Sequence, residues 1–295
     1  MRTPLVSVII ATFNRTDCLL ATLSSLDCQT YTPFEVIVVE DGSDRDAGAE
    51  VRGLRLRHPV SYRYIEKKGR AGARNEGIRL ARGEILLFFD DHSQPCSTLI
   101  AEHVKQHLAR ERHGGFRGRV EFREGFRRGA DMTREGSWSR FVHRLQGNNP
   151  IVNFGTHNLS VKRTVIERVG GFDEDFTLYG AEDQELGIRI RKSGFRLGYA
   201  SNALAYNIRL PKSPHSAAAR AIESGRMAAL LAVKHPEYRR SLGLHGLNHL
   251  IYLNGRSLRS AMRYIEKDEE ATPPPWGRRI RKILYFYSAF ESLGR

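Results

Sequence analysis

The stretch GRAGARNEGIRLARGEILLFFDDH, residues 69–92, decides the fold of this chain. Residues 70–82 have helical spacing, and residues 84–89 carry an apolar run typical of a buried strand in a parallel sheet. Two aspartates and a histidine follow that strand directly. Open α/β sheets bind their ligands beyond the carboxyl ends of the strands, so these three residues are the first candidates for a site.

The same alternation of strand and helix fills the first hundred residues. Apolar residues predict buried strands at residues 5–11 and 35–39, and a third strand is predicted at residues 61–65. Helices are predicted at residues 15–26, from helical spacing, and at residues 97–109. Such alternation indicates right-handed βαβ units and a parallel sheet, so the fold class is α/β. Polar residues follow the first two strands as well, so polar and acidic side chains are expected to gather at one edge of the predicted sheet.

The pattern weakens further along the chain. We predict a weak strand at residues 116–122, a strand at 158–161, helices at 162–169 and 182–192, and two edge strands at 195–200 and 203–208. Beyond Pro211 only helices are predicted, at residues 216–235, 241–266 and 278–293. We therefore predict an α/β domain over residues 1–210 and a helical region over residues 211–295. The helical region would form a wall of the binding site, an oligomer contact or a membrane-surface contact.

Composition sets the broad class of the protein. The chain has 295 residues, with 40% hydrophobic and 27% charged residues, which excludes a disordered or collagen-like chain. Three cysteines without a pairing pattern exclude a disulfide framework or a structural zinc site. No signal peptide and no long uninterrupted apolar run is visible. We expect a cytoplasmic protein, with contact at the inner face of the membrane left open.

The formal net charge of +14 favours an anionic partner. A nucleic acid is one such partner, but no RNA-recognition, KH or zinc-finger signature is present, and the acidic sheet edge would repel phosphates in the absence of a metal. We expect no nucleic-acid partner. The basic, aromatic segment 276–294 would lie on a membrane surface or pack on the protein itself.

Three motifs carry candidate chemistry. FFDDHSQP, residues 88–95, offers carboxylate and imidazole ligands suited to Mn²⁺ or Mg²⁺, although the aspartates could simply cap the next helix. Glu182 and Asp183 begin a helix, where a carboxylate can act as a general base or be an ordinary first-turn acid. The basic, glycine-rich residues 67–77 suit a diphosphate, or form a solvated face.

Taken together, VSVIIATFNR (6–15), VIVVEDGS (36–43), residues 69–92 and GGFDEDFTLYGAEDQELGIRIRKSG (170–194) resemble the family 2 glycosyltransferases with the GT-A fold. The resemblance covers residues 4–208. Its second half is also similar to the core of β-galactosyltransferases, chondroitin polymerases and polypeptide N-acetylgalactosaminyltransferases. It implies a Rossmann-like sheet that binds a nucleotide-sugar and transfers the sugar to an acceptor nucleophile, usually a hydroxyl.

The resemblance also implies site residues. Contacts to the nucleotide-sugar are expected from Thr12, Phe13, Asn14, Arg15, Asp41, Arg70, Arg74, Asn75, Asp90, Asp91 and Asn158. Thr156 and His157 would lie near the sugar. Metal ligands are expected at Asp90 and His92, completed by Asn207 or His215. Position 92 departs from the family, which usually has aspartate there, and this change bears on which metal is bound.

The implied mechanism is inverting, with Mn²⁺ or Mg²⁺ on the diphosphate. Asp183 is expected to be the general base, and Glu182 to orient a sugar or acceptor hydroxyl. UDP is the favoured nucleotide, with dTDP and GDP left open. A retaining transferase, a nucleotidyltransferase and a non-catalytic basic binding protein remain alternatives. The acceptor would be a glycan, a lipid-linked sugar, a peptide or a small molecule, and a homo-oligomer is left open.

Overall fold

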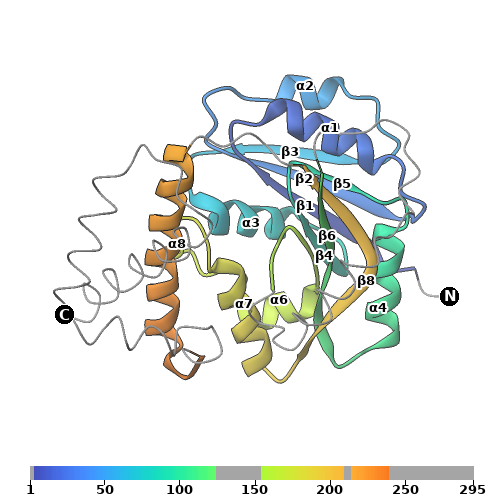
Figure 1. The fold of residues 1–295 in the computed structure, drawn as a ribbon. Helices are drawn as coiled ribbons and strands as arrows, with labels where there is room; N and C mark the ends of the chain where they lie inside the picture. The colour runs from blue at the N-terminus through green and yellow to red at the C-terminus, as the bar shows by residue number, and fades with distance from the viewer. Residues whose placement is uncertain (1–2, 124–153, 209–213, 239–295) are drawn as a thin grey trace. The chain divides into compact units, whose positions relative to one another are not determined.

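The computed structural model describes residues 3–123, 154–208 and 214–238, with the backbone alone described over 214–222 (Figure 1). The predicted helices at 241–266 and 278–293 lie outside the described residues, as does the segment 276–294. The chain divides into two compact units. The first comprises residues 1–174 and 183–210, and the second comprises residues 175–182 and 211–295.

The first unit is built on one eight-stranded sheet with the strand order β3-β2-β1-β4-β7-β6-β8-β5. Its strands are β1 (Val6–Thr12), β2 (Phe34–Asp41), β3 (Val60–Ile65), β4 (Ile85–Phe89), β5 (Ser93–Pro95), β6 (His113–Arg123), β7 (Asn158–Lys162) and β8 (Arg196–Ile208). The helices up to β8 are α1 (Thr16–Leu26), α2 (Gly48–Gly53), α3 (Gly69–Leu80), α4 (Leu99–Ala109), α6 (Arg163–Val169) and α7 (Glu182–Lys192). The predicted α/β sheet flanked by helices is confirmed.

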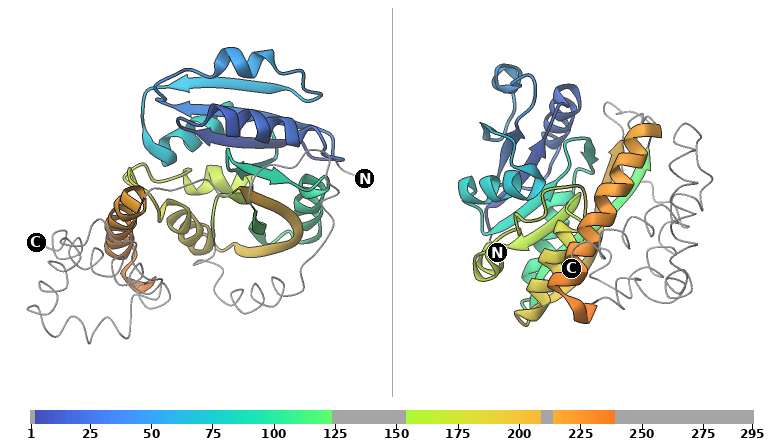
Figure 2. Two further views of the ribbon diagram at one scale, coloured as in Figure 1. Left: turned by 45° about the horizontal axis from the view of Figure 1, so that its top comes forward. Right: turned by 90° about the vertical axis from the view of Figure 1, so that its left-hand side faces the viewer.

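Helices cover both faces of the parallel strands, as Figure 2 shows for α1 and α3. Val8 and Ile10 of β1 belong to the same buried cluster as Leu19 and Leu23 of α1. On the opposite face, a Cβ added at Gly77 of α3 would come within 2.4 Å of Ile9. Since both faces are covered, every residue of β2 is buried, which explains the unbroken apolar run in its sequence.

The expectation of a parallel sheet holds for half of it. β1 pairs in parallel with both β2 and β4, and β2 pairs in parallel with β3. β7 runs antiparallel to β4, and β6 runs antiparallel to β7. The sheet is therefore mixed, and its strand direction changes at β7.

The two predicted edge strands at 195–200 and 203–208 are one strand, β8, and that prediction was wrong. β8 lies inside the sheet between β6 and β5. Its pairing with β6 jumps from Ala200 to Leu204, so the exposed polar pair Ser201 and Asn202 bulges out of the ladder. A polar bulge looks like a strand break in sequence. The edge is formed by the unpredicted strand β5.

A polar cluster lies within the core between α4 and the sheet. His103 Nε2 is 2.8 Å from Asn158 Oδ1, and His103 Nδ1 is 2.8 Å from Ser160 Oγ. His107 Nε2 lies 2.9 Å from the same hydroxyl. Burial lowers the pKa of His103 to about 4 and that of His107 to about 3, so both rings are neutral near pH 7.

The second unit contains α8 (Pro214–Lys234) and a short 3₁₀ helix, η1 (Pro236–Tyr238). The ammonium group of Lys234 lies 2.5 Å from a carboxylate oxygen of Asp175 and 5.7 Å from the centre of the Phe176 ring. These contacts join the end of α8 to residues 175–182. No helix in the described part of the chain has the length and apolar character needed to cross a membrane.

Candidate functional site

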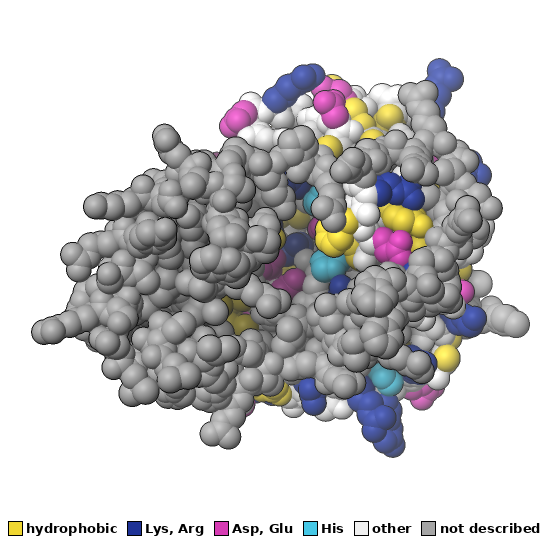
Figure 3. Space-filling view, viewed as in Figure 1, with side chains coloured by type: hydrophobic (Ala, Val, Ile, Leu, Met, Phe, Trp, Pro, Cys, Tyr) yellow, Lys and Arg dark blue, Asp and Glu magenta, His cyan; other side chains and the backbone are white. Residues whose placement is uncertain are grey.

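The carboxyl ends of β1, β2 and β4 meet at one edge of the sheet, because these strands are parallel. Thr12 ends β1, Asp41 ends β2 and Asp90 follows β4. The structure therefore brings these three predicted residues to the same edge. In Figure 3, basic, acidic and histidine side chains lie close together among the described residues of the face shown.

Asp91 is the centre of a hydrogen-bonded cluster at this edge. Its carboxylate accepts a hydrogen bond from Thr12 Oγ1 at 2.9 Å and one from Arg15 Nη1 at 3.0 Å. The third neighbour is His92, whose Nδ1 lies 2.8 Å from Asp91 Oδ1. Burial would raise the pKa of Asp91, but the His92 hydrogen bond and the Arg15 charge outweigh it and hold this pKa below its ordinary value.

Asp91 is therefore an ionised carboxylate with only 4% of its surface exposed. Both oxygens of its carboxylate are bonded to protein side chains. Thr22 Oγ1 also donates to its backbone carbonyl at 2.9 Å. It positions Thr12, Arg15 and His92 relative to one another. Its predicted direct contact with the nucleotide stays a prediction.

His92 and Asp90 fit a divalent cation only as part of a larger ligand set. The short contact with Asp91 assigns the ring proton of neutral His92 to Nδ1, which leaves the Nε2 lone pair for a metal. Asp90 Oδ2 accepts a hydrogen bond from Asn207 Nδ2 at 3.1 Å. In the parts of the chain that the structure describes, no group of three His, Cys, Asp or Glu side chains could hold a metal ion. Two ligands suit Mg²⁺ or Mn²⁺ when substrate phosphates supply the others.

The structure describes the side chain of only one of the two further predicted metal ligands, Asn207 and His215. Asn207 lies near the end of β8, where it pairs with Ser93 of β5, and its amide nitrogen donates to Asp90. It thus orients a candidate ligand. His215 falls in the first turn of α8, and its side chain lies outside what the structure describes.

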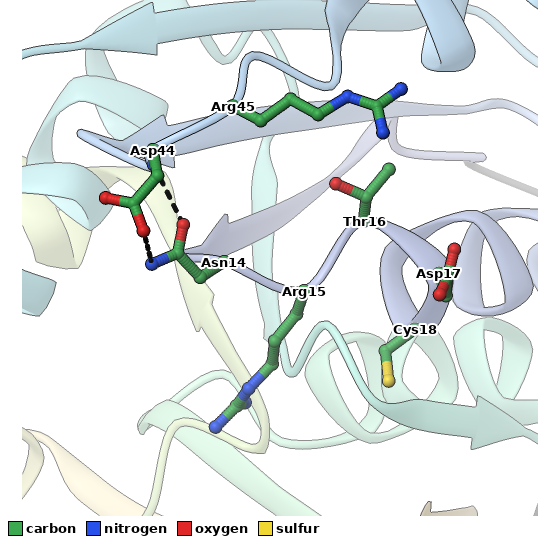
Figure 4. Close-up of a pocket in the computed structure, with 7 residues that line it drawn as sticks. All are labelled: Asn14, Arg15, Thr16, Asp17, Cys18, Asp44 and Arg45. Atoms are coloured by element: carbon green, nitrogen blue, oxygen red, sulfur yellow. Dashed lines mark hydrogen bonds between the residues drawn. The ribbon is translucent and has the colours of Figure 1, made fainter.

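The loop after β1 is fastened to the loop after β2. Asn14 adopts the left-handed backbone conformation, with φ of 52°, and its backbone N–H donates to Ser43 Oγ at 2.8 Å. Its side chain donates to Asp44 Oδ2 and accepts from the Asp44 N–H (Figure 4). Beside this contact lies a cavity of about 440 Å³ lined by Asn14, Arg15, Thr16, Asp17, Cys18, Asp44 and Arg45.

Phe13 and Asp41 flank the same loops. Phe13 is 39% exposed, and the Lys67 ammonium lies 4.1 Å from the centre of its ring. Asp41 Oδ1 accepts the Lys68 backbone N–H at 2.6 Å. Sequence reasoning singled out Lys67 only as a basic residue. Its contact with Phe13 depends on how β1 and the start of α3 are placed together.

The predicted diphosphate residues lie on α3 but differ in their surroundings. Arg70 is exposed, whereas Arg74 is buried, with its guanidinium 5.5 Å from the centre of the Phe172 ring. Asn75 donates to the Phe172 carbonyl and to Glu174, and accepts from the Phe172 N–H. The structure thus uses the Asn75 amide to hold residues 172–174 against α3.

Asp183 lies in the first turn of α7. The preceding residues Gly180 and Ala181 both have positive φ, of 100° and 73°, which turns the chain sharply into the helix. Asp183 Oδ1 accepts the Gln184 N–H at 2.8 Å, and Glu182 is buried. Arg189 ties α7 to the segment after α6, because its guanidinium group pairs with Glu185 at 2.6 Å and donates to the Gly171 carbonyl at 2.7 Å.

The residues before and within β7 divide between site and core. His157 is half-buried, and its pKa falls to about 4 because burial and the charges of Arg117, Arg74 and His92 outweigh the opposing charge of Asp90. It lies near those four groups. Thr156 is buried. Asn158 has no exposed surface and bonds to His103 and to the carbonyls of Arg119 and Ala203, so its side chain belongs to the core.

Comparison with known proteins gives consistent relatives. A family model described as glycosyl transferase family 2 matches residues 7–170, and one described as the N-terminal domain of galactosyltransferase matches residues 138–213. Validoxylamine A glucosyltransferase of Streptomyces hygroscopicus subsp. limoneus is 34% identical over 220 residues, covering 65% of this chain and 49% of that protein. An uncharacterized glycosyltransferase of Bacillus subtilis, YfnE, is 31% identical over 242 residues, covering 65% and 62%. The chain thus spans about half to three fifths of these relatives' length.

Solved structures match over nearly the whole chain at low identity. The mannosyltransferase PcManGT from Pyrobaculum calidifontis, in complex with GDP-Man and Mn²⁺, has a TM-score of 0.67 at 19% identity, covering 99% of this chain and 88% of that one. S. aureus TarS 1–349 in complex with UDP-GlcNAc has a TM-score of 0.55 at 17% identity, covering 98% and 91%. At these identities the likeness concerns the fold. With a family match over more than half of its residues, the chain belongs to glycosyl transferase family 2 and has the GT-A fold.

Proposed function

We propose that this chain transfers a sugar from a nucleoside-diphosphate donor, UDP-linked by preference, to an acceptor hydroxyl with inversion at the anomeric carbon. The observation that carries the proposal is the cluster of Asp90, Asp91 and His92 with Arg15 at the carboxyl ends of parallel strands. Membership of family 2 supports it. So do neighbours of the same fold in complex with GDP-Man, UDP-GlcNAc and UDP.

Asp90 and His92 Nε2 would hold Mn²⁺ or Mg²⁺, with diphosphate oxygens as further ligands. When bound, the ion neutralises negative charge that develops on the leaving diphosphate. Asn207 keeps the Asp90 carboxylate in place through its amide, and Asp91 fixes the ring of His92. A neighbour of the same fold in complex with Mn²⁺ supports this part of the proposal.

The donor would lie along the edge formed by β1, β2 and α3. Phe13 offers an exposed aromatic face for the base, and Asp41 and Asn14 line the same loops. Arg70 and Arg74 supply positive charge for the diphosphate, with Arg74 held against Phe172. Asn75 holds the segment that leads to α7.

Asp183 would remove the proton from the acceptor hydroxyl. Its position in the first turn of α7 favours the ionised form, and the Gln184 N–H steadies one carboxylate oxygen. As the acceptor oxygen attacks the anomeric carbon, the bond from that carbon to the diphosphate oxygen breaks and the proton passes to Asp183. Glu182 would orient a sugar or acceptor hydroxyl.

The acceptor is proposed only as a class: a glycan, a lipid-linked sugar, a peptide or a small molecule. We further propose that residues 211–295 form the acceptor wall, an oligomer contact or a membrane-surface contact. A location in the cytoplasm, at the inner face of the membrane, would suit the positive charge of the chain.

Calorimetric titration with UDP, dTDP and GDP tests the donor site. Each nucleotide is titrated in the presence of Mn²⁺, of Mg²⁺ and of a chelator. We expect one nucleotide to bind, with UDP first, and its affinity to fall when the metal is removed. Tight nucleotide binding with the same affinity in the presence of metal and of chelator would contradict the proposed role of the metal. Absence of binding in all three conditions would remove the transferase proposal and favour a non-catalytic role.

Product analysis separates the remaining alternatives. An inverting transferase releases a nucleoside diphosphate and gives a product whose anomeric configuration, read by NMR, is opposite to that of the donor. Retention of configuration would point to a retaining transferase. Release of pyrophosphate would point to a nucleotidyltransferase.

A further inference from the structure

Arg117 is a half-buried cation in β6, and the described part of the chain offers its guanidinium group no partner. Its Nε is fully buried and makes no hydrogen bond, and in the part of the chain that the structure describes no hydrogen bond, ion pair or ring contact is formed by this side chain. Burial lowers its pKa, while the charges of Tyr199 and Asp183 oppose that shift. A guanidinium group in such a place is unfavourable until an anion pairs with it.

The other arginines of the same strand each have a protein partner for the guanidinium group. Arg119 donates to Glu121, although its Nε also makes no hydrogen bond, and the Arg123 guanidinium lies 3.6 Å from the centre of the Tyr206 ring. Arg117 differs because the described residues around it supply charge at a distance but no hydrogen-bond acceptor for any of its nitrogens. An unpaired buried donor in a well-packed strand is a sign of a ligand that the protein alone does not provide.

The sheet register places Arg117 beside the donor edge. Arg117 pairs with Leu159 of β7, and Leu159 pairs with Phe88 of β4, two residues before Asp90. The backbones of β6 and β4 are therefore about 10 Å apart at this level. Because Phe116 contacts His107 of α4, its neighbour Arg117 points to the opposite face of the sheet.

Two of the groups that interact electrostatically with Arg117 belong to the proposed site. The Asp183 carboxylate is close enough to influence its pKa, and Arg117 in turn influences the pKa of His157. His157 also responds to Asp90, Arg74 and His92. Arg117 thus stands between the proposed general base and the residues proposed to hold the diphosphate.

We propose that Arg117 binds an oxyanion of the donor, either the diphosphate or a carboxylate carried by the transferred sugar. The inference rests on the proposed function and adds a specificity-determining residue to it. A guanidinium group presents parallel N–H donors that match the oxygens of phosphate or carboxylate, which an ammonium group cannot reproduce. The donor is favoured over the acceptor because the groups around His157 are those of the donor edge.

The test is calorimetric titration of Arg117→Met and Arg117→Lys with UDP, GDP, UDP-glucose and UDP-glucuronate. If the diphosphate is the ligand, Arg117→Met weakens binding of the nucleoside diphosphates at least about tenfold, as loss of a charged hydrogen-bonded partner does. If the sugar carboxylate is the ligand, affinity for UDP is unchanged. Only the preference for UDP-glucuronate over UDP-glucose is then lost. Arg117→Lys should restore affinity only in part.

Arg112→Met is the matched control, since it removes one positive charge from an exposed position directly before β6, at the end of that strand away from Asp90. Thermal unfolding of each variant checks that the fold is kept. Wild-type binding with unchanged affinities in Arg117→Met overturns the assignment of Arg117 and leaves the proposed function standing. An equal loss in Arg112→Met also overturns it, because the effect is then one of net charge. Absence of wild-type binding overturns the proposed function and this inference with it.

Discussion

At the scale of single residues, Asp183 is set apart from the neighbouring acids by its place. Its carboxylate lies in the first turn of α7, directly after the sharp turn at Gly180 and Ala181, and one of its oxygens accepts the Gln184 N–H. A general base must first of all be placed within reach of the proton that it removes. Asp91 is instead bonded to Thr12, Arg15 and His92, so its carboxylate is already engaged by protein groups.

Asp183→Asn should lower turnover by at least about a hundredfold, because the acceptor proton then has no base to receive it. Steady-state kinetics give turnover, and calorimetry with the nucleoside diphosphate should give an unchanged affinity. Glu167→Gln removes an exposed carboxylate of α6 and serves as the control. Near-normal turnover in Asp183→Asn would take the role of base away from this residue.

Which site residues could be predicted depended on where in the sequence they stand. Thr12, Asp41 and Asp90 follow apolar strands, and the sheet brings them together as expected. Asn158 and Asn75 have the right composition for a polar site, but the structure shows their amides bonded to backbone groups of the protein. Arg117 carried no signal, since its lack of a partner arises only when β6, β7 and β8 pair.

At the scale of elements, α3 connects the core to the donor edge. Its face toward the sheet has glycine at position 77, where a methyl group would come within 2.4 Å of Ile9. The helix can therefore lie close to β1 and β2, and Arg74 and Asn75 take their positions from that close approach. The predicted helix 70–82 has the right extent, but the glycine's role appears only with the sheet beneath it.

Gly77→Ala should lower the free energy of unfolding by about 1–3 kcal/mol, because the added methyl group overfills a packed interface. The displaced helix should also weaken nucleotide binding. Chemical denaturation measures the first effect and calorimetry the second. Gly53→Ala is the control, since an added Cβ there meets nothing within 4 Å. An equal free energy of unfolding in Gly77→Ala and wild type would contradict this prediction, because it would mean that α3 can shift away from the sheet without loss of stability.

Strands that are buried on both faces were predictable from their apolar residues. β1, β2 and β4 each contain a largely apolar run, which is interrupted by Ser7 in β1 and flanked by acids in β2, and they were identified correctly. β5 consists of Ser93, Gln94 and Pro95, which have no strand preference, and exists because β8 offers a free edge. The antiparallel direction of β7 was not predicted, because local sequence contains no information on strand direction.

At the scale of the whole molecule, the buried histidines make stability depend on pH. An unfolded histidine takes up a proton below about pH 6.5, whereas folded His103 and His107 do so only near about pH 4 and 3. Between these values the unfolded state binds more protons than the folded state. Stability therefore falls as pH is lowered from about 6.5 toward 4, and no such loss occurs above 6.5.

Urea unfolding at pH 7, 6 and 5 measures this loss. The free energy of unfolding should decrease with each step, and His107→Phe should decrease less steeply than wild type, although it starts from a lower value for want of the Ser160 hydrogen bond. Comparing the slopes removes contributions from His58 and His157, which are common to both proteins. An identical slope in His107→Phe would mean that this ring does not set the pH dependence.

The cluster around Asp91 also restricts how this chain can change over generations. His92 is bonded to a buried carboxylate that two further side chains share, so replacing it with the family's more usual aspartate would set two carboxylates side by side. Replacement of His92 with aspartate therefore requires a further substitution at position 12, 15 or 91 at the same time. The neighbours of His92 thus disfavour its replacement alone. Lineages that carry all four residues of the cluster should retain or lose the four together.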